Sequence, residues 1–142
     1  MANSKSIGVA FEDQNITGAD FVSAGTVYAT GEIGYSAAGQ GTVTQATSKS
    51  TGVTLNKSAG QITMNNAALA AATNVTFTLT NSTLSAKDVL ILNVSGAATS
   101  GAYNCWVSSM SAGSATVTLR NITAATSLSE AVVLNFAIIH CA

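Results

Sequence analysis

Apolar and polar residues alternate in several short runs after about residue 50. In Asn74–Thr80 every second residue is apolar and polar residues stand between them, and the same pattern occurs in 61–65 and 115–120. A period of two directs alternate side chains to opposite faces of a β-strand. These runs therefore predict strands with one buried face. The side chains predicted to point inward are Ile62, Met64, Val75, Phe77, Leu79, Ala115, Val117 and Leu119.

Two other segments, 88–94 and 131–139, are apolar on both faces. Such runs are typical of central strands, or of strands whose outer face meets another subunit. One further segment, 66–73, is rich in Ala and Leu, which favour helix. Because it is short, we expect a loop or a single helical turn there.

The connections between the predicted strands contain Gly, Asn and Ser, which suit tight turns. With roughly ten residues from one strand to the next, the sequence predicts an all-β fold, either an antiparallel β-sandwich or a jelly-roll-like small barrel. The chain contains no proline, and the predicted strands lack the Pro and Lys that usually block edge-to-edge pairing. Their edges are therefore expected to be occupied in an assembly.

The chain of 142 residues is long enough for one domain with an arm. Residues 1–48, rich in Gly, Ser, Ala and Thr, are predicted to form an extended N-terminal arm, in which 26–35 is a candidate strand pair. Residues 49–142 are predicted to form the β-sandwich domain. The alternative for the arm is a solvated tail, which would not need aromatic anchors. The arm residues expected to contact neighbouring subunits or another partner are Phe11, Phe21, Tyr28 and Tyr35.

Composition indicates that much of the surface is covered in use. Only 8% of the residues are charged, against roughly 25% in an ordinary soluble domain, while 47% are hydrophobic and the formal net charge is -1. Proteins near zero net charge lack the mutual repulsion that opposes association. With five Lys and Arg residues in the whole chain, binding to nucleic acid has no electrostatic basis.

Residues for catalysis or metal binding are sparse. The single histidine, His140, is next to Cys141, but adjacent residues of a strand point to opposite faces. Together with Cys105 they would supply at most three ligands, without the paired spacing of structural zinc sites. Asp88 and Glu130 each precede an apolar strand, and we expect each to be a solvent-exposed charged side chain at the start of that strand. The sequence therefore predicts no catalytic, cofactor or metal site, and no enzymatic activity; both cysteines are expected as free thiols.

The sequence also gives no sign of membrane insertion or secretion. Its longest apolar runs are well below the roughly 18 residues that suggest a membrane span. Its start, with Lys5 followed by Glu12 and Asp13, does not resemble a signal peptide. Six matches to Asn-x-Ser/Thr, at Asn15, Asn56, Asn74, Asn81, Asn93 and Asn121, are expected by chance in a chain so rich in these residues. We expect a protein made in the cytosol.

Residues 42–139 resemble structural proteins of tailed bacteriophages, particularly capsid decoration (cement) proteins and some tail-fibre ends. The likeness is carried by TQATSKSTGVTLNK (44–57), GQITMNNAALAA (60–71), FTLTNS (77–82), the turn at 100–104 and SLSEA (127–131). These are framework and turn residues, so the resemblance implies a fold and a setting without implying a reaction. It implies a homotrimer on the outside of a capsid, synthesised in the bacterial host cytoplasm, which binds the major capsid protein and locks capsomers together.

The sequence thus favours a virion protein that stabilises the capsid lattice, with the arm aromatics as candidate capsid contacts. The alternative is a tail-fibre or tailspike module that attaches to host receptors. That role would require exposed aromatic side chains gathered on one outer face, and Trp106 with Tyr103 is the candidate pair.

Overall fold

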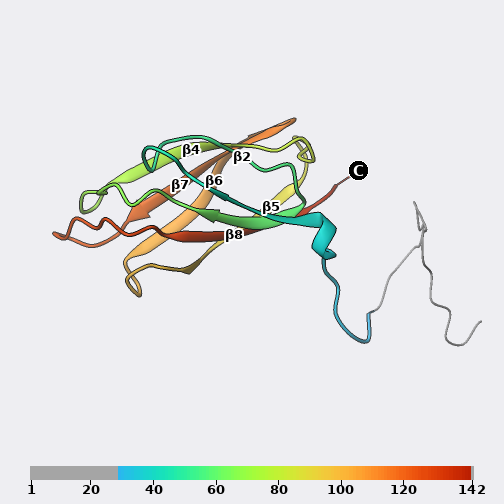
Figure 1. The fold of residues 1–142 in the computed structure, drawn as a ribbon, viewed down its shortest axis with the longest axis horizontal. Helices are drawn as coiled ribbons and strands as arrows, with labels where there is room; N and C mark the ends of the chain where they lie inside the picture. Colours follow the sequence, from blue (N-terminus) through green and yellow to red (C-terminus); the bar gives the residue numbers. More distant parts are fainter. Residues whose placement is uncertain (1–28, 142) are drawn as a thin grey trace, which may run out of the picture. The chain divides into compact units, whose positions relative to one another are not determined.

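The computed structural model of the protein describes residues 29–141, and Figure 1 shows its ribbon. The strands all lie in the compact unit that begins at Gly34. A short 3-10 helix, η1, precedes the first strand. The elements are η1 Ala37–Gly39, β1 Gln40–Thr44, β2 Val53–Thr54, β3 Ala59–Thr63, β4 Asn74–Thr80, β5 Val89–Gly96, β6 Tyr103–Ser111, β7 Ser114–Asn121 and β8 Val133–Ile139.

The strands form two four-stranded sheets, in the orders β1-β3-β8-β5 and β2-β4-β7-β6. Within the described residues neither sheet closes on itself, so the predicted all-β sandwich is confirmed and the barrel alternative is not formed. The sheets are mixed, because β1 pairs with β3 and β2 with β4 in parallel while the other pairs are antiparallel. The predicted antiparallel pairing therefore holds for four of the six strand pairs and not for these two. The reason is topological: β1 to β4 alternate between the sheets, and two crossings return the chain in its original direction.

The core lies between the inner faces of the two sheets, whose strands Figure 1 shows as two layers. All but one of the side chains predicted to point inward are buried, and Val75 is partly buried against the same cluster. Leu79, Leu119 and Leu134 are completely excluded from solvent. On the outward side of β7, Thr118 is also buried, and its hydroxyl hydrogen-bonds to the hydroxyl of Ser108 in the bulge of β6.

The two strands that are apolar on both faces occupy different places. β8 lies between β3 and β5, as predicted for a central strand, whereas β5 is at the edge of the sheet order. The outward side chains of Val89 and Ile91 are each 50% exposed. The segment 66–73 contains no helix and is held instead by a bridge between Leu69 and Leu128, as expected for a loop.

The sandwich begins earlier in the chain than residue 49. β1, at Gln40–Thr44, pairs with β3 along its whole length, so this part of the predicted arm belongs to a sheet. Its neighbour η1 also lies in the compact unit. No strand occurs at 29–35, the described part of the candidate strand pair.

Two buried asparagines, Asn81 and Asn121, form matching turns at the ends of the adjacent strands β4 and β7. In each turn the Oδ1 atom accepts hydrogen bonds from the backbone N–H and hydroxyl of the threonine two residues on. The amide nitrogen of Asn121 donates to the carbonyls of Leu69 and Thr126, and that of Asn81 to the Lys57 carbonyl. Two of the Asn-x-Thr matches thus have a structural role.

Replacement of Gly60 by alanine is expected to destabilise the protein by about 1–3 kcal/mol. A Cβ atom at Gly60 would lie 2.5 Å from the Gly41 carbonyl oxygen and 2.8 Å from a methyl group of Leu55, so β1 and β3 would have to separate. Gly96→Ala is the control, because a Cβ there meets nothing within 4 Å. Urea unfolding of both variants measures the difference, and equal stabilities would contradict this packing.

Asn121→Ala is expected to lower the free energy of unfolding by about 1–3 kcal/mol, because it leaves buried backbone groups without partners. Asn104→Ala, at an exposed position of β6, is the matched control and should change stability by less than about 0.5 kcal/mol. Chemical denaturation of both variants tests this prediction. A loss at Asn121 no larger than at Asn104 would show that the turn is dispensable.

Candidate interaction surfaces

Of the four aromatic residues predicted to make contacts, only Tyr35 lies within the described residues; Phe11, Phe21 and Tyr28 lie outside them. Tyr35 is half-buried, and its hydroxyl donates a hydrogen bond to the Ile138 carbonyl in β8. A Cβ atom added at Gly39 would be in van der Waals contact with the Tyr35 side chain, so this side chain lies close to Gly39. Tyr35 therefore fastens the segment before β1 to the sandwich.

The outer face of the β1-β3-β8-β5 sheet carries no ionisable side chain. The register of the four strands places its outward residues in rows across the sheet. These residues are Gln40, Thr42 and Thr44 of β1, Ala59, Gln61 and Thr63 of β3, Val133, Asn135, Ala137 and Ile139 of β8, and Val89, Ile91, Asn93 and Ser95 of β5. The only ways for this face to bind a partner are hydrogen bonding and apolar contact.

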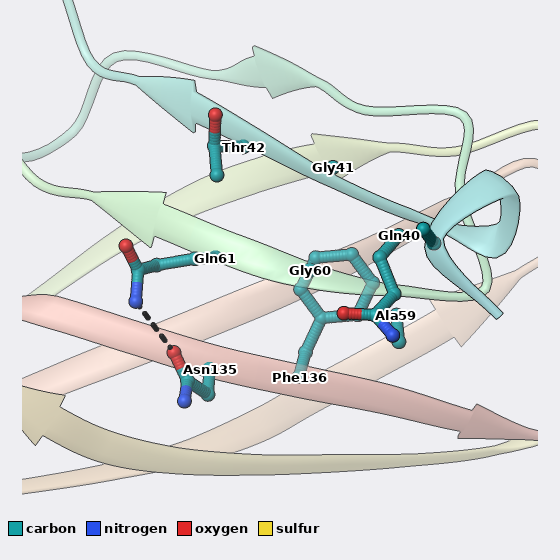
Figure 2. A pocket seen from close by; sticks show the side chains of 9 residues that line it. Gln40, Gly41, Thr42, Ala59, Gly60, Gln61, Asn135 and Phe136 are labelled. Atoms are coloured by element: carbon teal, nitrogen blue, oxygen red, sulfur yellow. Dashed lines mark hydrogen bonds between the residues drawn. The ribbon is translucent and has the colours of Figure 1, made fainter. Parts of the chain in front are cut away.

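One row of this face consists of amides and a hydroxyl. Thr42, Gln61, Asn135 and Asn93 are in register across the sheet. The Gln61 amide donates to Asn135 Oδ1 at 3.1 Å (Figure 2), and the Ser95 hydroxyl donates to the same oxygen at 2.9 Å. The β1 end of the row borders a shallow hollow of about 500 Å³, whose lining contains no acid, base or thiol. Its polar side chains can donate and accept hydrogen bonds, and two of its lining residues are glycines, but it has no group that could act as an acid or a base.

One corner of the same face is apolar. Val89 lies directly opposite Ile139, and Ile91 directly opposite Ala137. The side chains of Val89, Ile91 and Ile139 are 50%, 50% and 52% exposed. We call these four residues the apolar corner. Contiguous exposed apolar side chains of this kind mark contact surfaces more often than isolated ones do.

The outer face of the β2-β4-β7-β6 sheet is hydroxyl-rich, and its one ionisable side chain is Arg120. Threonines of β4 and β7 lie side by side, with Thr76 opposite Thr118 and Thr78 opposite Thr116. Trp106 of β6 also lies on this face, 37% exposed. Tyr103 is three residues away along the same strand, and its ring packs against the core from the other face. The two aromatic side chains therefore do not form one exposed cluster.

Asp88 is a buried anchor between the loop before β5 and the end of β8. The expectation of a solvated charge at this strand entry was wrong, because the Asp88 side chain is 1% exposed. Its oxygens accept bonds from the Cys141 and Ser85 backbone N–H groups and the Ser85 hydroxyl, and Oδ2 lies 3.0 Å from His140 Nδ1. The bonds from Cys141 and Ser85 hold the pKa of Asp88 well below its ordinary value.

Glu130, the other charged residue predicted at the start of a strand, is half-buried and lies beside the buried Lys49. The Thr99 hydroxyl donates to Glu130 Oε1 at 2.6 Å, and this contact lowers the pKa of Glu130. Lys49 Nζ donates to the carbonyls of Asn65 and Glu130, while burial lowers the pKa of Lys49. Burial, together with the neighbouring Glu130, raises the pKa of Tyr103 to about 12. This polar cluster joins the β1–β2 connection to the segment before β8.

The structure brings His140 next to Asp88, a contact that sequence spacing did not reveal. The Cys141 thiol donates to the Ile139 carbonyl at 3.9 Å, so its hydrogen bond is directed at the backbone. Cys105 and Cys141 are both free thiols, as expected, and burial raises the pKa of Cys105, which disfavours the thiolate. In residues 29–141 no group of three or more His, Cys, Asp or Glu side chains could hold a metal ion.

Comparisons with known proteins identify no relative: no family model, no curated protein and no solved structure matches the chain. Among the described residues, no helix has the length and apolar character needed to cross a membrane.

Acidification is expected to reduce the stability that the Asp88 carboxylate contributes to the fold. Because the folded-state pKa lies below the ordinary value of 3.8, the carboxylate contributes stability above that pH, and the contribution is lost as the pH falls further. Asp88→Asn should therefore be less stable than the parent protein at pH 7 and should lose less stability on acidification. Thermal unfolding from neutral to acidic pH measures both effects. Glu32→Gln removes an exposed carboxylate as the control; equal acid sensitivity of Asp88→Asn and the parent would contradict the anchor.

Proposed function

We propose that this protein is a structural component of a bacteriophage virion, a cement or decoration protein that binds the outside of the capsid lattice and stabilises it. The observation that carries the proposal is the lack of charge on the sandwich: of the two outer faces, one has no ionisable side chain and the other has Arg120 alone. Such faces are poorly suited to a free monomer and well suited to burial against protein.

The physics of a cement protein fits these surfaces. Apolar burial contributes about 25 cal/mol per Å² before the costs of association are subtracted. A small sandwich that bridges neighbouring capsid subunits adds such area at each joint, and many weak joints add up over a shell. Hydroxyl and amide side chains supply hydrogen bonds without the desolvation cost of charged groups. The role requires no reaction, and we propose that the protein is not an enzyme.

We propose the major capsid protein and further copies of this chain as partners, with a homotrimer as the expected assembly, and neither nucleic acid nor membrane as a partner. Phe11, Phe21 and Tyr28 are the candidate capsid contacts in the N-terminal arm. Tyr35 is a weaker candidate, because its hydroxyl is engaged by β8. The attachment segment is therefore best sought before Gly34, where the compact unit begins.

The alternative role as a receptor-binding module of a tail fibre gains less from the structure. Trp106 is partly exposed, but Tyr103 packs against the core and its hydroxyl is buried. The pair therefore lacks the shared exposed face on which aromatic rings would stack against a glycan.

Purified virions are expected to contain this protein at a copy number comparable to that of the major capsid protein. Removal of residues 1–33 should leave the sandwich folded by circular dichroism and abolish its attachment to capsids. Quantitative mass spectrometry of virions and capsid co-sedimentation measure the two effects. A Thr78→Ala variant, altered at an exposed threonine of β4, is the control for handling and should still attach. A copy number of only a few per virion, or full attachment without residues 1–33, would count against this assignment.

A further inference from the structure

The first segment of the sandwich, residues 34–44, is attached to it by little apolar contact. None of its side chains is buried. Val43 of β1 is the one side chain of this segment that packs against the hydrophobic core, and Gly41, the other inward position of β1, has no side chain to pack. The edge strand of the other sheet, β6, contributes four such partly buried side chains, namely Tyr103, Cys105, Val107 and Met110. Because apolar burial is the main source of stability, residues 34–44 gain less from the core than β6 does.

Hydrogen bonds hold this segment mainly along one side. β1 is at the edge of its sheet and pairs with β3 in parallel, the geometry that is slightly less stable per residue. Two side-chain hydrogen bonds add to the pairing: the Tyr35 hydroxyl donates to the Ile138 carbonyl, and Lys57 Nζ donates to the Ala38 carbonyl at 2.8 Å. The groups involved are exposed or partly buried, so water can replace these partners at a small net cost when the segment leaves.

The attachment of the chain changes abruptly at Gln45, directly after β1. The Gln45 side chain is buried; it donates to the carbonyls of Lys49 and Thr51 and accepts the Asn65 N–H. The Gln45 N–H also donates to the Thr63 carbonyl. Removal of a buried amide from these partners would leave polar groups unsatisfied, which is costly. The chain is therefore firmly held from Gln45 onward and weakly held before it.

We infer that residues 34–44 form a releasable strap, which detaches from β3 as a unit while the sandwich from Gln45 onward stays folded. Local opening is favoured in segments that have little buried apolar surface and exposed hydrogen bonds. Opening frees about 11 residues, which span up to about 35 Å when extended. This inference deepens the proposed function and rests on it only for the force: an arm fixed to a capsid would draw out the strap before it unfolded the sandwich.

Amide hydrogen exchange of the full-length protein, measured over a series of low urea concentrations, tests the proposal. The β1 amides that donate to β3 should exchange roughly tenfold or more faster than the paired amides of β7, which lies inside the other sheet. Their exchange should depend only weakly on urea, because opening of the strap exposes little surface. The same rate and the same urea dependence in β1 and β7 would mean that β1 opens only with the whole sandwich, and would overturn the proposal.

Two valine-to-alanine variants separate opening of the strap from unfolding of the sandwich. Val43→Ala removes the core contact of the strap and should accelerate exchange in β1 roughly fivefold or more. Val117→Ala, at a fully buried position of β7, should accelerate exchange in β4 and β7 roughly tenfold or more. It should leave exchange in β1 unchanged, because the sandwich is folded in both states of the strap. Equal acceleration of β1 and β7 in Val117→Ala would contradict the strap.

The urea series uses the unaltered protein and so remains decisive if a variant does not fold. Both experiments are made without capsids, which keeps their outcome separate from that of the proposed function. A strap that opens in a protein that binds no capsid removes the cement role alone. A protein that binds capsids but whose β1 opens only with the whole sandwich removes the strap alone.

Discussion

Period-2 alternation governs this molecule, because each strand sends half of its side chains into the space between the sheets and half outward. The inward half is ordinary: Ile62, Leu119 and Leu134 are fully excluded from solvent and hold the two layers together. The outward half is unusual, because threonine, serine, asparagine, glutamine and aliphatic residues stand where charged side chains commonly keep a sandwich soluble. The same geometry that forms the core thus produces two surfaces that favour burial against protein.

Several of the few charged or strongly polar side chains of the described residues serve the interior. Lys49 is buried and donates to two backbone carbonyls, and Asp88 joins the loop before β5 to the residues after β8. Gln45 holds the β1–β2 connection by donating to the carbonyls of Lys49 and Thr51 while it accepts the Asn65 N–H. Buried polar groups require partners, and these residues satisfy backbone groups in connections that have little apolar material.

Sequence pattern was sufficient for β3, β4, β5, β7 and β8 and for the inward side chains of β3, β4 and β7, since these depend on neighbours along the chain, but it did not predict β1, β2 or β6. The inward positions of Phe77 and Val117 follow directly from alternation. The parallel pairing of β1 with β3 could not be read in this way, because it depends on β2 joining the other sheet. Likewise, the contact between Asp88 and His140 spans 52 positions and is created by strand order. The apolar composition of β5 was visible, but its edge position, which leaves Val89 and Ile91 outside, was not.

The proposed role depends most directly on whether protein covers these nearly uncharged faces in the assembled state. An electron cryomicroscopy reconstruction of the virion that carries this chain measures that coverage. The sandwich is expected on the capsid exterior, with the outer face of β1-β3-β8-β5 against a neighbouring protein surface. A reconstruction in which this sandwich is absent, or in which both of its faces are open to solvent, would contradict the proposed cement role.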